Sequence, residues 1–343
     1  MSRWALVALL LLLLAATLGF TQLLHVWEEP LVIEEGGLVL NVPPGASLRT
    51  IAEELEGKGI LRQPNLLIVY GRLTGADQSL RHGEYWIPEY TTPEYLLTLL
   101  QRGEVMQYQV TLPEGITLAR AIEILRDEKQ LQHVVESVDD PELLKLVEPY
   151  TNPEGWFFPD SYRYTRGASD LSILERARDA MRQVLQEEWH NRAEQLPYET
   201  PYEALTMASI VERETGLASE RAEIAGVFMR RLHAGMRLQT DPTVIYGIGD
   251  AFDGNLRRSH LRDPDNLYNS YQHHGLPPSP IALPGRAAIH AALHPAPGDT
   301  LFFVARGDGG HVFSRTLAEH EEAVREYQLK RRQDYRSSPR RGN

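Results

Sequence analysis

An uncharged apolar segment near the N-terminus constrains this chain more than any other feature. It covers residues 4–24, is 21 residues long and contains no Asp, Glu, Lys or Arg. As a helix it would span ~31 Å, which is enough to cross the hydrocarbon core of a bilayer. We therefore predict a transmembrane helix over residues 4–25, preceded by a cytoplasmic stub at residues 1–3 and followed by an external body.

The residues on either side of this segment set the predicted orientation. Arg3 precedes it and Glu28 and Glu29 follow it, so the positive-inside rule places the N-terminus in the cytoplasm. The alternative is a cleaved signal peptide, for which Ala15 and Ala16 would supply the small residues near the cleavage point. Because the apolar run exceeds a usual signal-peptide core, we favour an uncleaved single-pass anchor in the inner membrane with a periplasmic body.

Charge and composition exclude several classes of function. The net charge of −12 argues against a nucleic-acid partner, because neutralising phosphates requires a basic surface. The chain contains no cysteine, so disulfides and thiolate chemistry are excluded. Basic residues gather in the last stretch, residues 328–343, which we predict to be a disordered tail.

Two segments of the chain share one local pattern, in which a strand leads through a Pro- and Gly-containing turn into a capped helix. In the first, Ser47 caps a helix that follows the turn at residues 43–45, and in the second Thr117 caps a helix after residues 112–115. We predict a small α/β module over residues 38–110 and a larger α+β domain over residues 111–327. The overall fold class is α+β.

Two glutamates near the middle of the chain, Glu212 and Glu214, are the candidate catalytic carboxylates. On a helix, Glu214 shares one face with the apolar residues Ile210 and Val211, whereas Glu212 lies about 200° away. Burial on an apolar face raises the pKa of a carboxyl group and makes it a usable general acid near neutral pH. We select Glu214 as the acid and keep Glu212 as the alternative, although charged helix residues are more often simply solvated.

A polar, turn-rich segment beginning at residue 239 is suited to a neutral, hydroxyl-rich ligand. Its side chains can donate and accept hydrogen bonds, and an Asp-Pro step marks a turn or a helix start. A second polar segment follows at residues 268–271. The candidate ligand-binding residues are Gln239, Thr240, Asp241, Tyr246, Asn269 and Tyr271.

A histidine pair raises the possibility of a metal site. His290 and His294 are four residues apart, so both could reach one ion from a helix. Ala291 stands where a His-Glu-x-x-His motif has its glutamate, and Pro295 would end the helix. We therefore predict no metal and no cofactor.

Several blocks of this sequence resemble the YceG-like endolytic murein transglycosylases, and they occur in the family's order. The resemblance runs from about residue 40 to residue 327. The blocks are residues 153–162, 209–215, 236–247, 275–281 and 303–313.

The resemblance implies an enzyme that cuts peptidoglycan glycan strands internally and leaves 1,6-anhydro-N-acetylmuramic ends. It places the catalytic glutamate in the helix of Glu212 and Glu214, and it makes the module at 38–110 LysM-like. It also implies peptidoglycan synthases of elongation or division as partners. Two alternatives remain: a membrane-tethered wall-binding scaffold without activity, and a zinc-dependent wall hydrolase.

An aromatic cluster in the block at residues 153–162 could contact such a glycan through ring stacking. We expect Phe157 and Phe158 to be buried. Trp156 or Tyr162 would then reach the sugar.

Overall fold

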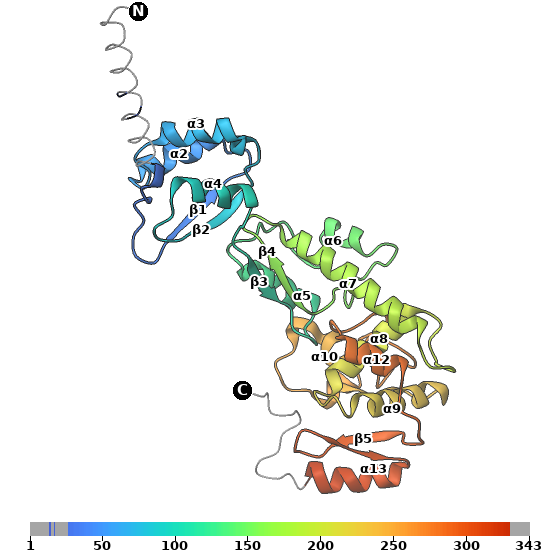
Figure 1. The fold of residues 1–343 in the computed structure, drawn as a ribbon. Helices are drawn as coiled ribbons and strands as arrows, with labels where there is room; N and C mark the ends of the chain where they lie inside the picture. Colours follow the sequence, from blue (N-terminus) through green and yellow to red (C-terminus); the bar gives the residue numbers. More distant parts are fainter. Residues whose placement is uncertain (1–13, 15–16, 18–26, 330–343) are drawn as a thin grey trace, which may run out of the picture. The chain divides into compact units, whose positions relative to one another are not determined.

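The computed structural model describes residues 14, 17 and 27–329, which form two compact units (Figure 1). The first unit runs to Tyr108 and also includes residues Arg163–Ala168, and the second comprises Gln109–Tyr162 and the chain from Ser169 onward. Helices and three separate two-stranded sheets build these units, so the mixed α+β class is confirmed. No helix within the described residues is long and apolar enough to span a bilayer, and the anchor predicted at 4–25 lies outside them except at residues 14 and 17.

The first unit packs helices on an antiparallel strand pair. Strand β1 (Leu38–Val42) pairs with β2 (Gly83–Ile87), and Leu40 lies opposite Tyr85 in the buried core. The predicted cap is present, because the Ser47 hydroxyl accepts the Thr50 N–H at 3.1 Å. The helices of this unit are α2 (Leu48–Gly57), α3 (Pro64–Thr74), the short η1 (Ala76–Gln78) and α4 (Pro93–Arg102).

A buried carboxylate holds residues 163–168 to the first unit. Glu84 on β2 forms an ion pair with Arg166 at 2.5 Å, and it also accepts a hydrogen bond from the Tyr108 hydroxyl. Because Glu84 is buried, losing either partner would leave its charge poorly compensated. The predicted module at 38–110 did not include this returning segment.

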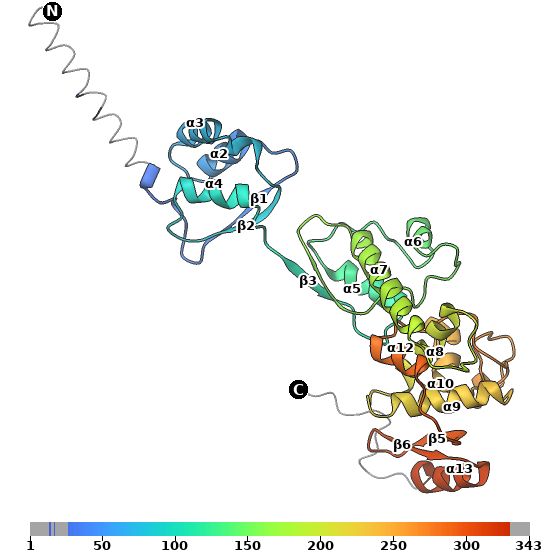
Figure 2. The same ribbon diagram turned by 45° about the vertical axis from the view of Figure 1, so that its right-hand side comes forward.

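The second unit is mainly helical. Figures 1 and 2 show its C-terminal strand pair and helix lying beside the helix Arg221–His233, labelled α9. Its helices are α5 (Leu118–Asp127), α6 (Pro141–Leu146), α7 (Asp170–His190), α8 (Pro201–Glu214), α9 (Arg221–His233), α10 (Asp241–Ile248), η2 (Gly249–Ala251), α11 (Arg258–Leu261), α12 (Arg286–Leu293), α13 (Leu317–Val324) and the π-helical turn η3 (Arg325–Leu329). The remaining strands are β3 (Tyr108–Thr111) paired with β4 (Ser161–Tyr164), and β5 (Phe302–Ala305) paired with β6 (His311–Ser314).

Helix α8 is the central element of the second unit. Every residue from 204 to 211 is buried, and α12, α9, α7 and α10 all pack against this helix. Its start is fixed by a capping box between Thr200 and Glu203, with Pro201 at the first helical position. A helix buried on all sides is held rigidly, so a side chain at its end is well positioned.

Helix α9 does not begin where its sequence pattern indicates. A serine just before an apolar stripe is a typical cap, which favours Ser219, but the helix starts at Arg221 and Glu220 occupies the N-cap position without a side-chain cap bond. The Glu220 carboxylate is engaged elsewhere, because it accepts the backbone N–H of His311 at 3.0 Å and lies 2.8 Å from its Nδ1 atom. This contact, distant in sequence, explains why the Glu220 side chain does not cap the helix.

Candidate active site

Glu214 is the last residue of α8, and its carboxylate faces the loop that leads into α10. The Oε1 atom accepts a hydrogen bond from the hydroxyl of Thr240, which is the N-cap residue of α10. The next residue, Thr215, already has an extended backbone, so the helix ends directly at the carboxylate. Glu214 is half-buried, which keeps it in contact with the protein interior while leaving part of its surface accessible.

Hydrogen bonds fix the loop that carries Thr240. Its backbone N–H donates to the Ser270 hydroxyl at 3.0 Å, and its carbonyl accepts from Thr243 at 2.8 Å. The neighbouring Gln239 has a φ of +54°, and its N–H donates to the Ser270 carbonyl at 3.1 Å. Thr240 therefore presents its hydroxyl to Glu214 from a fixed position.

The electrostatic surroundings of Glu214 suit a proton donor near neutral pH. Burial is the main cause that raises its pKa from 4.5 to about 7, and the negative charge of Asp241 adds to this effect. The Thr240 hydrogen bond and the positive charge of Arg231 act in the opposite direction. A pKa close to the working pH allows one carboxyl group both to give and to accept a proton.

Arg231 is a site residue that the sequence reasoning missed. It is buried on α9, and its guanidinium donates to the carbonyls of Leu301 at 2.7 Å and Leu238 at 2.5 Å. The signal was available, because Arg231 lies three residues after Phe228 on the apolar face of this helix. It supports the start of the Thr240 loop and supplies positive charge near Glu214.

Four of the predicted ligand-binding residues gather around Glu214. Besides Thr240, these are Gln239, Asp241 and Tyr271, and the Tyr271 hydroxyl donates to Asp241 at 2.7 Å. Burial is the largest cause that raises the pKa of Tyr271, and the negative charges of Asp241 and Glu214 raise it further. Gln239 and Asp241 are exposed and Tyr271 is half-buried, so these side chains are accessible to a ligand.

Asn269 has a different setting. It is fully buried, and its amide donates to the carbonyls of His260 at 3.0 Å and Asp263 at 2.7 Å. Its side-chain oxygen accepts the Tyr271 N–H at 3.0 Å. Asn269 therefore shapes the loop that presents Tyr271.

Glu212 points to other partners, as the helix spacing predicts. Its carboxylate accepts the N–H of Gly285, the N-cap residue of α12, at 3.0 Å and lies 3.6 Å from Arg221. Its side chain is only 6% exposed, and burial is the largest cause that raises its pKa. Glu212 thus joins three elements of the second unit, whereas Glu214 contacts the polar loop.

A cavity of about 910 Å³ in the second unit contains another carboxylate, Glu154. Glu154 is buried and accepts the N–H of Leu118 at 2.9 Å and the hydroxyl of Tyr246 at 3.3 Å. Burial raises its pKa to about 7, although both hydrogen bonds oppose that shift. Tyr246, Arg213 and Pro242 also line the cavity, which places it beside the ends of α8 and α10. Glu154 lies in the block at 153–162, but its sequence neighbours give no sign of its partners.

The expectation for the aromatic cluster is wrong for both residues expected to reach the ligand. Trp156 and Tyr162 are buried, at 5% and 8% exposure. Trp156 stacks between aromatic neighbours, with its ring centroid 4.7 Å from Tyr150 and 5.8 Å from Tyr202. Tyr162 donates its hydroxyl to the carbonyl of Phe158 at 2.6 Å, a local bond that turns the ring inward.

Phe157 is fully buried as expected, whereas Phe158 is only partly buried. Packing among the rings of the second unit decides the orientation of the cluster.

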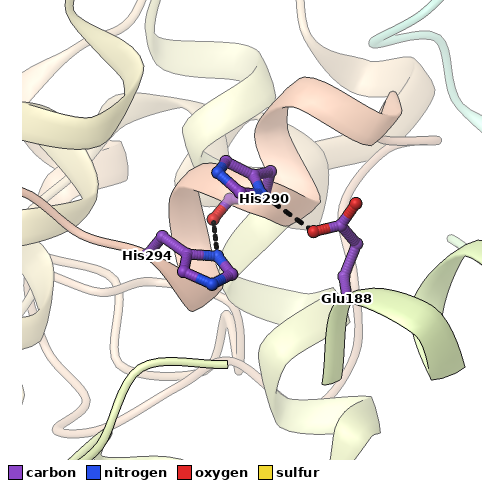
Figure 3. Close-up of side chains that lie close together, drawn as sticks. All are labelled: Glu188, His290 and His294. Atoms are coloured by element: carbon purple, nitrogen blue, oxygen red, sulfur yellow. Dashed lines mark hydrogen bonds and ion pairs between the residues drawn. The ribbon is translucent and has the colours of Figure 1, made fainter. Parts of the chain in front are cut away.

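The histidine pair has a third partner that the sequence did not reveal. Among the described residues, Glu188 of α7 is the acid that joins His290 and His294 in a group whose ligand atoms lie within 4.8 Å of one another (Figure 3). His294 follows the last residue of α12, as Pro295 predicts.

Comparison with known proteins shows the family of this chain. Residues 40–326 match the model of the YceG-like family. The chain belongs to the YceG-like family. This YceG-like chain is 29% identical over 306 residues to the endolytic murein transglycosylase of Bacillus subtilis (strain 168), with 84% of each protein covered.

A second curated relative and a solved structure also match this chain. The endolytic murein transglycosylase of Streptococcus pneumoniae (strain D39) is 25% identical over 332 residues; the match covers 84% of the YceG-like chain and 58% of that relative. A crystal structure of a YceG-like protein from Listeria monocytogenes superimposes with a TM-score of 0.52 at 27% identity, covering 84% of this chain and 99% of that one.

Proposed function

We propose that this YceG-like protein is an endolytic lytic transglycosylase that cleaves the MurNAc-β-1,4-GlcNAc bond within peptidoglycan glycan strands. The names of the bacillar and pneumococcal relatives support the substrate and the reaction class. The burial and the raised pKa of Glu214 support its assignment as the catalytic acid. Glu214 is a half-buried carboxyl group with a pKa of about 7 at the edge of an accessible polar loop.

The reaction requires one carboxyl group that acts twice. Protonated Glu214 donates its proton to the glycosidic oxygen as the bond from the anomeric carbon to that oxygen breaks. The C6 hydroxyl of the same muramic residue then attacks the anomeric carbon, and the Glu214 carboxylate takes the hydroxyl proton. The products are a 1,6-anhydro-muramic end and a new GlcNAc end, and no water, metal or cofactor is consumed.

A hydrolase would need a second carboxylate to activate water, at a separation that depends on its stereochemistry. Asp241 is the residue of the Glu214 site that could take that role, but it accepts a hydrogen bond from Tyr271. In the transglycosylase reaction Asp241 acts through its charge, which adds to the larger effect of burial in raising the pKa of Glu214.

The glycan would lie along the polar loop and the neighbouring cavity. Gln239, Asp241 and Tyr271 offer accessible hydrogen-bonding groups beside Glu214, and Tyr246 offers a hydroxyl at the cavity wall. An endolytic enzyme must hold sugars on both sides of the bond that it cuts. A cavity of about 910 Å³ lined by Tyr246 and Arg213 has room for such neighbouring sugars.

The proposal also includes a membrane anchor, a glycan-binding role for the first unit and protein partners. The segment at residues 4–25 would anchor the protein in the inner membrane with its enzymatic body in the periplasm. The first unit would act as a LysM-like glycan-binding module. An anchored endolytic enzyme acting on nascent strands could terminate their elongation, which makes the peptidoglycan synthases of elongation or division its expected partners.

The decisive experiment replaces each glutamate with glutamine, which keeps the volume and removes the proton chemistry. Purified glycan strands are incubated with the full-length protein, and the products are identified by mass spectrometry. We expect Glu214→Gln to lose at least ~10²–10⁴-fold in the release of anhydro ends. Glu212→Gln, the matched control in the same helix, should retain most of the activity.

Three outcomes would contradict parts of this proposal. An active Glu214→Gln enzyme beside an inactive Glu212→Gln enzyme would make Glu212 the acid. Reducing ends from the wild type would make the protein a hydrolase. If folded wild-type protein bound strands without cutting them, it would be a wall-binding scaffold.

A further inference from the structure

Helices α7 and α12 bring a carboxylate and two imidazoles together at a place distinct from Glu214. Glu188 projects from α7, and His290 and His294 project from the end of α12 (Figure 3). One ligand atom from each of the three lies within 4.8 Å of the others. We propose that this group is a zinc site that joins the two helices.

Both ring nitrogens of His294 lie near backbone carbonyls, and one of these contacts is clearly the shorter. Its Nε2 atom lies 2.7 Å from the carbonyl of Asn191, whereas Nδ1 lies 3.2 Å from the carbonyl of His290. The His290 carbonyl already accepts the backbone N–H of His294 at 2.7 Å. The shorter of the two ring contacts indicates that the ring proton lies on Nε2. Nδ1 would bind a metal once the ring turns away from the His290 carbonyl and from the His290 ring, on which it stacks with centroids 4.2 Å apart. A carbonyl that fixes the tautomer in this way is typical of histidines that bind metals.

Glu188 and His290 supply the other two ligand atoms. The Nδ1 atom of His290 lies 2.8 Å from Oε2 of Glu188, and a divalent metal would replace the proton that they share. Arg286 holds the second carboxylate oxygen at 3.1 Å, so Glu188 presents a single oxygen to the site. The His290 side chain is 58% exposed, so its ring can rotate to bring the three atoms to bonding distance.

The donor set indicates the metal and its coordination. Two imidazoles and one carboxylate suit Zn²⁺, which takes nitrogen ligands at about 2.0–2.1 Å and carboxylate oxygens at about 2.0–2.2 Å in a tetrahedral arrangement. A cavity of about 730 Å³ is lined by both Glu188 and His290, so the fourth position is open to water. Because α12 packs on α8, a metal here would stabilise the helices that position Glu214 without entering the reaction.

The test uses the full-length protein, purified without a histidine tag and freed of metal. Titration calorimetry with ZnCl₂ should give one zinc ion per chain, and zinc should raise the melting temperature as a ligand of the folded state does. His290→Ala, His294→Ala and Glu188→Gln should each weaken binding by more than the ~10–100-fold that loss of an outer hydrogen-bonding partner costs. The control is His233→Ala, which removes an exposed histidine at the end of α9 and should bind zinc like the wild type.

Two results would overturn the proposal. One is the absence of saturable binding at one zinc per chain, which would leave the group as a hydrogen-bonded contact between Glu188 and His290. The other is wild-type zinc affinity in His290→Ala, because that variant lacks one of the three proposed ligands. A loss of binding in this variant would not be due to unfolding, since the His290 side chain is 58% exposed. Neither result depends on whether the protein cleaves glycan strands.

Discussion

At the scale of single residues, the adjacent residues Thr240 and Asp241 shift the pKa of Glu214 in opposite directions. The Thr240 hydroxyl donates to the carboxylate and favours its charged form, whereas the negative charge of Asp241 favours the protonated form. Burial is larger than either effect, and the balance brings the pKa of Glu214 to about 7. The two neighbours therefore provide independent ways to change the protonation of one group.

This opposition predicts opposite changes in the pH profile of two variants. The general acid is lost as pH rises through its pKa, so kcat/KM of the wild type should fall above about pH 7. Asp241→Asn removes a negative charge, lowers the pKa of Glu214 and should move this fall to lower pH. Thr240→Val removes the donor to the carboxylate, raises that pKa and should move the fall to higher pH. Shifts of the same sign in both variants would show that another group limits the reaction.

At the scale of elements, local sequence signals determine helix starts but not the partners of polar side chains. Ser47 and Thr117 cap their helices as predicted, because a cap needs only the next three residues. At the start of α9, Glu220 makes no side-chain cap bond, because its carboxylate contacts His311 from another element. For the same reason the sequence pointed to Glu214 and to the polar loop at residue 239, but it could not show that Thr240 donates to Glu214 or that Tyr246 donates to Glu154.

Arg231 offers a test of how α9 supports the loop of the site. Arg231→Lys keeps the positive charge, but an ammonium group cannot reproduce the planar fork that reaches the carbonyls of Leu301 and Leu238. A buried carbonyl left without its donor costs about 1–3 kcal/mol, so the free energy of unfolding in urea should fall by at least that amount. Arg237→Lys, an exposed change in the same loop, should stay within ±0.5 kcal/mol of the wild type. Equal stability of the two variants would contradict this role of Arg231.

At the scale of the whole molecule, the candidate catalytic groups all belong to one unit. Glu214, Glu154 and the loop at residues 239–241 lie in the second unit, which also contains the helical core around α8. That core buries Glu154 and half-buries Glu214, and burial is the largest cause that raises the pKa of both from 4.5 to about 7. An arrangement that favours proton transfer therefore also makes the stability of the fold depend on pH.

The sign of that dependence follows from the raised pKa values. In the unfolded chain these carboxyl groups ionise near pH 4.5, whereas in the folded protein they ionise near pH 7. The contribution of each protonated group is complete below about pH 4.5 and is lost as the pH rises to about 7. A shift of about 2.5 units corresponds to a loss on the order of 3 kcal/mol for each group.

Glu214→Gln should remove one of these two contributions to the pH dependence. The variant should match the wild type near pH 4.5 and exceed its free energy of unfolding at pH 8, by up to ~3 kcal/mol. Urea denaturation across this range measures the difference, and Glu175→Gln, an exposed change of the same charge on α7, is the control. A Glu214→Gln protein that loses stability between pH 4.5 and 8 as steeply as the wild type would mean that Glu214 ionises in the folded protein as it does in the unfolded chain. Glu214 would then lack the raised pKa that a general acid at neutral pH requires.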